Sequence, residues 1–160
     1  MKRAAWLLLI PVALALIFTG WQWLLGELIL TAQGVETHAA SEWQEEYDAV
    51  YAALSKDALL GVQLNGDAPE DGRGCVFKVY TLRLANRGLI PADMVEIEFA
   101  SMPDDIAYWP GQSRATVPAQ SEREVQVYLL TRETASPARD LIVTYYLWGH
   151  PQRVKFTVGG

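Results

Sequence analysis

The feature that most constrains this chain is an apolar run near its N-terminus. Residues 4–18 carry no charged side chain, and the apolar character resumes through residues 21–25. A helix over residues 4–25 would be about 33 Å long at ~1.5 Å per residue, enough to cross a bilayer core of roughly 30 Å. We therefore expect residues 4–25 to insert into the lipid bilayer, so that residues 1–30 form a cytoplasmic tip and a transmembrane anchor.

The residues that flank the run indicate its orientation. Lys2 and Arg3 precede it, and basic side chains favour the cytoplasmic side of a membrane. Trp6 lies at one end of the run and Trp21 and Trp23 at the other, as in the aromatic belts of membrane proteins. We expect a single-pass protein of the cell membrane with a cytoplasmic N-terminus and an extracytoplasmic C-terminal domain, periplasmic or extracellular.

A cleaved signal peptide is the alternative interpretation of this segment. The apolar region of a signal peptide runs for about 7–15 residues and ends in a small-x-small cleavage site. Here apolar residues continue past Gly20, and only poor cleavage sites follow. The sequence favours an uncleaved anchor and leaves cleavage open.

The remaining composition narrows the class of protein. Residues 31–160 contain 11 basic and 18 acidic side chains, a net charge of −7, which disfavours nucleic acid as a partner. The single cysteine, Cys75, excludes an intrachain disulfide. An exported domain without disulfides is more typical of a bacterial cell envelope than of a eukaryotic secreted protein.

Residues 31–58 are predicted to form a membrane-proximal linker with a short amphipathic helix over residues 41–57. Ser41 is the expected N-cap of this helix. An apolar stripe with helical spacing must be covered by the chain's own β domain, by a second copy or by a partner. The stripe consists of Trp43, Tyr47, Val50 and Leu54.

From residue 59 onward the apolar period changes from helical to two, which is typical of half-buried strands separated by turns. Seven short strands within about 100 residues match an immunoglobulin-like sandwich. The chain is thus predicted to be mainly β, with the sandwich over residues 59–160. The expected strands cover residues 60–64, 75–86, 92–100, 112–117, 121–131, 139–148 and 153–158.

Three segments of these strands resemble a known group of domains. They are Tyr80–Gly88 (YTLRLANRG), Val95–Phe99 (VEIEF) and Val117–Val127 (VPAQSEREVQV). Over residues 76–158 the sequence is similar to bacterial Ig-like accessory domains, both the CARDB type and the Ig-like tail of cytochrome-oxidase maturation ferredoxins. Gln120 stands where those families usually have glycine. The resemblance implies an Ig-like fold and a non-catalytic role.

Residues that could carry chemistry are few. His150 lies in a Gly-His-Pro turn and His38 in the linker, without a partner motif for catalysis. Cys75, Met94, Met102 and His150 are the soft metal ligands, but they lack the spacing of a metal motif. We expect no enzyme activity, no metal and no other cofactor.

Two acidic loops are candidates for calcium, since oxygen-rich loops on sandwiches can bind this ion. Neither has EF-hand spacing, and solvated turn acids are the simpler interpretation. The loops contain Asp67, Glu70 and Asp71, and Asp104 and Asp105.

The aromatic residues left over after the core is assigned suggest a recognition surface, because Tyr and Trp bury a large area at low entropic cost. Packing under a loop or against the linker helix is the alternative. The candidate binding residues are Tyr108, Trp109, Tyr128, Tyr146 and Trp148, together with Trp43 and Tyr47 of the linker.

These features predict a membrane-anchored, non-enzymatic interaction module that serves as an accessory or assembly subunit of a membrane protein complex. Its partner would be another membrane or envelope protein and not a nucleic acid, and the oligomeric state stays open. The alternative is a copper-handling assembly factor of a respiratory complex.

Overall fold

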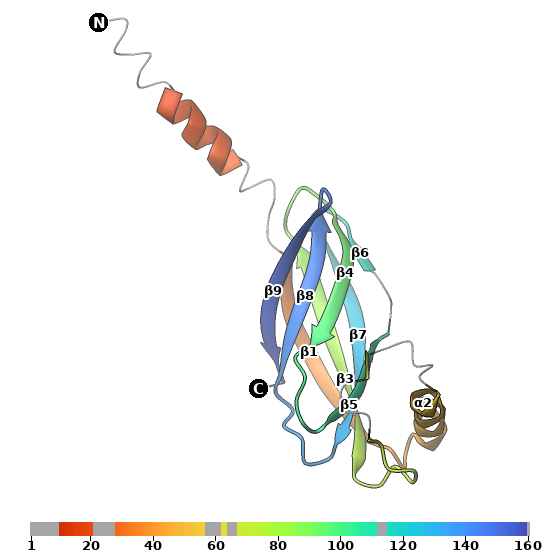
Figure 1. The fold of residues 1–160 in the computed structure, drawn as a ribbon. Helices are drawn as coiled ribbons and strands as arrows, with labels where there is room; N and C mark the ends of the chain where they lie inside the picture. The colour runs from red at the N-terminus through yellow and green to blue at the C-terminus, as the bar shows by residue number, and fades with distance from the viewer. Residues whose placement is uncertain (1–9, 21–27, 57–61, 64–66, 112–114, 160) are drawn as a thin grey trace, which may run out of the picture.

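The fold is an antiparallel β-sandwich with one helix packed on its outside (Figure 1). The computed structural model describes residues 10–20, 28–56, 62–63, 67–111 and 115–159. The elements of the sandwich in chain order are β1 (Leu28–Ala39), α2 (Gln44–Ser55), β2 (Val62–Gln63), β3 (Cys75–Asn86), β4 (Ala92–Phe99), β5 (Asp105–Pro110), β6 (Ala115–Val117), β7 (Ser121–Arg132), β8 (Arg139–Leu147) and β9 (His150–Val158).

The strands form two sheets. The five-stranded sheet has the order β1-β3-β7-β5-β2, and the four-stranded sheet has the order β6-β4-β8-β9. All of the strand pairs are antiparallel. The sequence therefore predicted the mainly β sandwich correctly.

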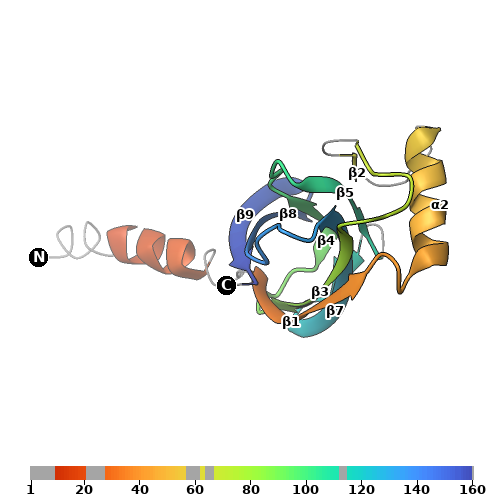
Figure 2. The same cartoon turned by 90° about the horizontal axis from the view of Figure 1, so that it is seen from below.

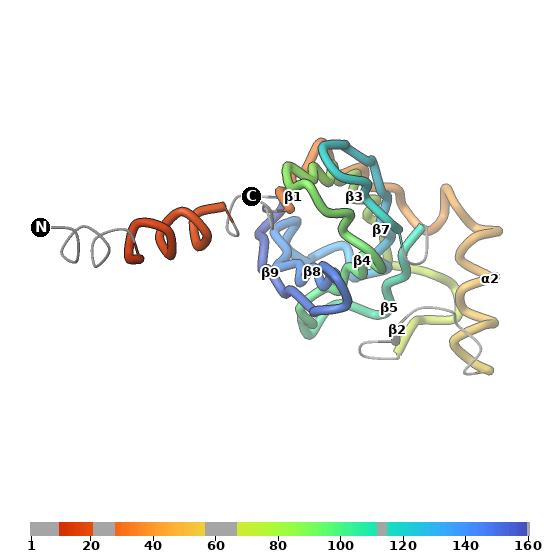
Figure 3. The backbone as a smooth tube through the Cα atoms, turned by 90° about the horizontal axis from the view of Figure 1, so that it is seen from above, coloured from red at the N-terminus to blue at the C-terminus, as the bar shows by residue number. Residues whose placement is uncertain are grey.

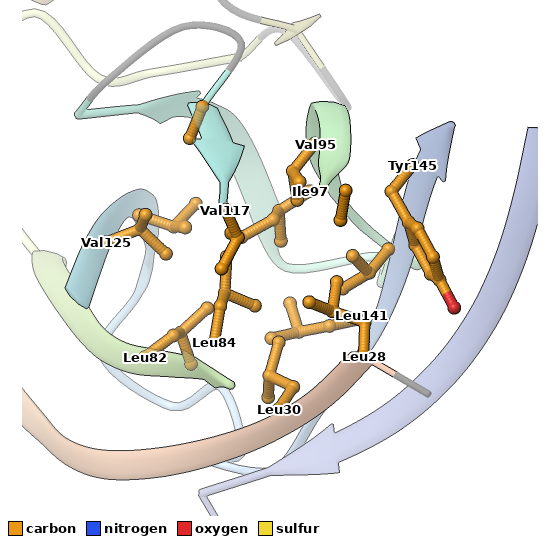
Figure 4. Close-up of a cluster of buried hydrophobic side chains, with 14 of the residues drawn as sticks. Leu28, Leu30, Leu82, Leu84, Val95, Ile97, Val117, Val125, Leu141 and Tyr145 are labelled. Carbon is orange, nitrogen blue, oxygen red and sulfur yellow. The ribbon is translucent and has the colours of Figure 1, made fainter. Parts of the chain in front are cut away.

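The main core lies between the sheets and follows from period-two alternation. Along β8 the residues alternate between buried and half-buried from Arg139 to Leu147, and along β4 they alternate between buried and exposed from Val95 to Phe99. Leucine and valine side chains from both sheets meet in this layer (Figure 4). Burial of these side chains is the main stabilising contribution, at roughly 25 cal/mol per Å² of apolar area removed from water.

A second, smaller core lies on the outer face of the five-stranded sheet, where α2 covers it. Tyr47 and Leu54 of α2 are buried against Cys75, Phe77 and Leu130 of the sheet. Figures 2 and 3 show α2 outside the sandwich, on the side of the molecule away from β9. Of the three covers considered for the apolar stripe of α2, the chain's own domain is the one found.

This second core explains an irregular pattern in β3. Residues 75–80 are all buried: Tyr80 belongs to the main core and Cys75 and Phe77 to the second core, so both faces of the strand are covered here. After Tyr80 the outer face is no longer covered, and the strand alternates as an ordinary half-buried strand.

Two strands differ from the prediction. Residues 28–39, which were assigned to the end of the anchor and to the linker, form β1 and pair with β3 along its whole length. Residues 105–110, which lie between the expected strands 92–100 and 112–117, form β5. The sandwich therefore begins at Leu28 and not at residue 59.

The position of α2 changes as a consequence. The 12 residues of β1 run the length of the sandwich before α2 begins, a distance of about 40 Å at ~3.3 Å per residue. The helix is therefore not next to the apolar N-terminal segment, as the linker prediction required. It also begins at Gln44 with Trp43 as N-cap residue and without a side-chain cap, so Ser41 does not have the predicted role.

Register places four features at one end of the sandwich, called the entry end below because β1 begins there. Leu28 pairs with Asn86 and Asn86 with Ser121, so β3 ends and β7 begins at this end. The loop from β3 to β4, the turn before β7 and the turn between β8 and β9 lie here as well (Figure 1). The opposite end, called the far end, carries α2 and the loop from β7 to β8.

The expected anchor is described only in part. Residues 10–20 are helical, and their side chains are exposed; the rest of the 4–25 segment lies outside the described residues. Within the part of the chain that the structure describes, no helix is long and apolar enough to cross a membrane.

Candidate interaction surfaces

A row of five aromatic rings crosses the outer face of the five-stranded sheet, and is called the aromatic row below. The ring of Trp43 stacks on His38 with centroids 4.2 Å apart, and lies 5.6 Å from Phe77. Trp109 meets Phe77 edge to face at 6.2 Å and stacks on Tyr128 at 5.7 Å, with planes within 6°. The row therefore links β1, β3, β5 and β7 in one continuous set of contacts.

The two ends of the aromatic row are half-exposed and rigidly held. Trp43, Trp109 and Tyr128 are all of intermediate burial, while Phe77 in the middle is 1% exposed. Gly111 approaches Tyr128 so closely that a Cβ there would lie 2.9 Å from the ring. Aromatic faces that are fixed in this way lose little conformational entropy when they bind a partner.

A second surface lies at the entry end. Trp148 is 57% exposed, Met94 43% and Leu89 40%, and these are the exposed large hydrophobic residues of the sandwich as far as it is described. Leu89 lies in the loop from β3 to β4, Met94 near the start of β4, and Trp148 in the turn between β8 and β9. We call these three residues the apolar tip.

The backbone at the entry end is unusual. Met94 (φ 49°), Gln120 (φ 51°) and Trp148 (φ 51°) are the described non-glycine residues with positive φ, and all three lie there. A left-handed conformation is costly for a side chain with a Cβ, and such strain tends to gather at functional sites. Two of these three residues belong to the apolar tip.

Local geometry explains both strained tip residues. Met94 lies where β4 carries one extra residue relative to β6 and β8, a β-bulge that interrupts both ladders. Trp148 and Gly149 (φ 77°) form a two-residue turn between Leu147 and His150, and positive φ at both positions is what a type I′ turn requires. In each case the conformation turns a large apolar side chain outward.

The predicted binding residues fall into separate places. Trp43, Trp109 and Tyr128 lie in the aromatic row, and Trp148 lies in the apolar tip. Tyr146 is half-buried on β8 and pairs with Asp93 and Pro151 near the entry end.

The prediction that Tyr47 and Tyr108 belong to a binding surface is wrong, because both side chains are buried. Tyr47 is 0% exposed in the core under α2, and Tyr108 is 5% exposed in the main core. The short strand β5 points Tyr108 inward and its neighbour Trp109 outward, an alternation that was missed because no strand was expected over residues 105–110. Both buried rings help to build the surface without forming part of it.

The buried charges belong to a structural network at the far end. Arg139 donates a hydrogen bond to Asp105 Oδ1 at 2.7 Å, and Thr131 donates to the same oxygen at 3.0 Å. Lys78 Nζ donates to the carbonyls of Ala135 and Ser136 at 2.7 and 3.1 Å, and burial lowers its pKa. The network fastens the loop from β7 to β8, and neither member of the ion pair is exposed.

The soft metal ligands are divided between the two ends of the sandwich, with Cys75 and Met102 at the far end and Met94 and His150 at the entry end. Cys75 is buried at the start of β3 at the far end, and burial raises the pKa of its thiol. Met94 and His150 lie at the entry end, a full strand length away from Cys75. Among the described residues no three His, Cys, Asp or Glu side chains are grouped as a metal site would need.

The two acidic loops are engaged in local contacts. Asp71 pairs with Arg73 at 2.9 Å, and Asp105 accepts the bonds of the buried network. Asp71 is exposed, as expected of a solvated turn acid, whereas Asp105 is 0% exposed and is not one.

Leu89 and Met94 were not among the predicted binding residues. The alternation along β4 placed Met94 on the outer face, but an isolated exposed methionine is common and carries no signal. The apolar tip is recognised only from the pairing register of the strands, which brings Met94 to the same end as Leu89 and Trp148.

The known structures compared with this chain have low similarity to it. No protein-family model and no curated protein matches the chain. Among solved structures, a FixG-related protein from Vibrio parahaemolyticus has 12% identity and a TM-score of 0.35 over 52% of this chain and 78% of that one. The cupredoxin domain of amoB from Nitrosocaldus yellowstonii has 11% identity and a TM-score of 0.34 over 84% and 88%. Similarity this low carries no argument about function.

Proposed function

We propose that this protein is a membrane-anchored, non-enzymatic module that binds another protein of the same membrane through the aromatic row, as an accessory or assembly subunit. The observation that carries the proposal is the pair of half-exposed, stacked rings of Trp109 and Tyr128 on the outer face of the five-stranded sheet. Rigid aromatic side chains of this kind are enriched where protein interfaces gain most of their binding energy.

The strand order supports the immunoglobulin-like description. In a constant-type Ig domain one sheet has the order A-B-E-D and the other C-F-G. The order β1-β3-β7-β5 opposite β4-β8-β9 corresponds to this arrangement strand by strand, with the short β2 and β6 added at the edges. Such sandwiches frequently serve as binding domains, and this analogy of fold supports a binding role.

The N-terminal sequence supports an extracytoplasmic location for the sandwich. The apolar length of residues 4–25 fits a bilayer, and Lys2 and Arg3 favour a cytoplasmic N-terminus. In this arrangement the sandwich is extracytoplasmic, and its partner lies in or on the same membrane.

The described residues do not favour copper handling as a second function. A copper site needs soft ligands close together, and Cys75 and His150 lie at opposite ends of the sandwich.

Site-specific photo-crosslinking of the full-length chain in its own membrane tests the proposal. A photoreactive residue at Gln126 would report on the outer face next to Tyr128, because Gln126 is exposed there. One at Glu98, exposed on the outer face of the four-stranded sheet, is the matched control. We expect a discrete adduct with one membrane protein from Gln126 and none from Glu98.

Variants then assign the adduct to the aromatic row. Replacement of Trp109 and Tyr128 by alanine should abolish the adduct. Gln126→Arg should weaken it as well, while changing the free energy of unfolding by no more than about 0.5 kcal/mol because the position is at the surface. Equal adducts from both positions, or a detergent-extracted chain that is alone and monodisperse, would overturn the proposal.

A further inference from the structure

The apolar tip is on the same end of the sandwich as the chain's apolar N-terminal segment. Leu28, the first residue of β1, pairs with Asn86, and the loop that holds Leu89 begins directly after Asn86. The turn that holds Trp148 closes the β8–β9 hairpin at this end (Figure 1). The described sandwich thus exposes its large apolar side chains where its tether arrives.

We propose that the apolar tip lies in the interfacial region of the bilayer, so that the sandwich rests with its entry end on the membrane surface. The inference rests on the proposed anchor, because a bilayer must be within reach. It assigns Leu89, Met94 and Trp148 the role of lipid contacts.

Chain length limits how far the tip can be from the membrane. Residue 25, the last of the expected span, is three residues from Leu28, and an extended chain covers at most ~3.6 Å per residue. Leu28 therefore lies within about 11 Å of the end of the span. Since the interfacial layers add several ångströms on each side of the hydrocarbon core, the entry end is held in these layers or directly next to them.

The chemistry of the tip fits this environment. Tryptophan prefers the membrane interface because it combines an apolar body with a polar N–H group. Arg87 and His150 are exposed beside the tip and suit the level of the lipid phosphates, while Asp93 next to Met94 is acidic. With both signs of charge present, apolar contact and not attraction to anionic lipid is expected to hold the tip.

Backbone strain supports a role for these side chains. Asparagine at position 148 would suit the left-handed conformation of the turn far better than tryptophan does. Trp148 is also 57% exposed, so much of its ring is available for a contact outside the domain.

The test uses the full-length chain in phosphatidylcholine vesicles that contain no other protein. A polarity-sensitive fluorophore is attached to Leu89→Cys at the tip, to Glu133→Cys at the far end, or to Leu14→Cys in the apolar segment. Lipids brominated near the glycerol end of the acyl chains quench fluorophores that reach them. Cys75 is buried, and labelling of the unsubstituted chain measures its background.

We expect the Leu89→Cys and Leu14→Cys labels to lose fluorescence in brominated vesicles and the Glu133→Cys label to keep it. Addition of Trp148→Asn and Met94→Ser should reduce the loss at Leu89→Cys without unfolding the domain, because both changes relieve strain or sit at the surface. The loss should be insensitive to salt.

The other possible outcomes decide separately on the tip contact and on the anchor. Quenching at Leu14→Cys without quenching at Leu89→Cys would overturn the tip contact and leave the anchor standing, as expected for a tip that binds a protein instead. Quenching at Leu89→Cys alone would keep the tip contact and remove the anchor. Equal quenching at Glu133→Cys, or none at any position, would overturn the inference.

Discussion

Arg139 and Asp105 form an ion pair that is closed off from water at the far end of the sandwich. Both side chains are 0% exposed, and Arg139 Nε has no hydrogen-bond partner among the described residues. A buried pair of this kind gains little net stability over an apolar pair, but removal of one member leaves an unpaired buried charge. Loss of one member is therefore expected to destabilise the fold by more than the intact pair stabilises it.

Arg139→Met should lower the free energy of unfolding by about 3–5 kcal/mol, because Asp105 would be left buried without its partner. The additional change Asp105→Leu should recover part of the loss. Urea denaturation of the detergent-solubilised chain, followed by circular dichroism, measures both. Lys155→Met, which breaks the exposed pair with Asp140, is the control and should have little effect. Similar losses for Arg139→Met and the control would contradict the argument.

A substitution of Trp148 is expected to change the free energy of unfolding in the opposite direction. Trp148→Asn should raise the free energy of unfolding by about 1 kcal/mol, since asparagine accepts the left-handed conformation that tryptophan adopts there at a cost. The same urea titration applies, with Tyr146→Phe as a neighbouring control. A less stable variant would mean that Trp148 is held by contacts within the domain and would weaken the case for strain at the tip.

At the scale of elements, strands with one covered face were predictable and strands with other kinds of burial were not. The alternation of β4, β7, β8 and β9 is visible in the sequence, because one face meets the main core and the other meets water. β1 is largely exposed after Leu30 and so carries no apolar period; its pairing with β3 defines it. The position of α2 depended on β1 and was wrong for that reason.

The candidate surfaces were predictable to a similar degree. The outward position of Tyr128 followed from alternation, whereas Trp148 points outward because of its turn and not as a residue of the strand to which it was assigned. Tyr108 was assigned to the surface because β5 is short, bulged and nearly continuous in burial, so that no period identifies it as a strand. The apolar tip depends on register between distant strands, which a single sequence does not reveal.

The helix α2 should behave as a unit that can open separately from the main core. Tyr47→Ala removes the side chain that is fully buried between α2, Phe77 and the loop at Pro69, to whose carbonyl its hydroxyl donates. Hydrogen exchange should accelerate over residues 44–55 while the amides of β4 and β8 stay protected. Glu45→Ala on the exposed face is the control. Equal acceleration in β8 would show that both cores unfold together.

At the scale of the whole molecule, the buried tyrosines should make the fold sensitive to alkali. Burial raises the pKa of Tyr80 and Tyr108 to about 12 each, and it also raises the pKa of Tyr47. In the unfolded chain these phenols ionise near pH 10. Between pH 10 and 12 the folded state therefore holds more protons than the unfolded state, so stability falls as pH rises.

Each such tyrosine contributes a slope of about 1.4 kcal/mol per pH unit in this window. Lys78 acts in the opposite direction, since burial lowers its pKa and the unfolded state holds its proton longer, which offsets part of the decline. Urea titrations from pH 8 to pH 11 measure the profile. Tyr108→Phe should flatten the decline, and a profile that stays level above pH 10 would contradict the raised pKa values.

The two proposed surfaces lie on different parts of the sandwich. The apolar tip is at the entry end, and the aromatic row lies along the side of the five-stranded sheet toward the far end. With the tip on the membrane, the strands would stand up from the bilayer. The aromatic row would then face sideways, where a neighbouring membrane protein with an extracytoplasmic domain can reach it.

The pairing of β1 has a mechanical consequence. The tether enters at Leu28, and the strand runs from there along β3 as far as Ala39, with one bulge between Ala32 and Gly34. A partner that pulls the sandwich away from the anchor would drag β1 lengthwise along its neighbour, so that the hydrogen bonds of the ladder share the load and do not break one after another. We expect the domain to resist tension on its tether far better than it would if the first strand were peeled from its outer end.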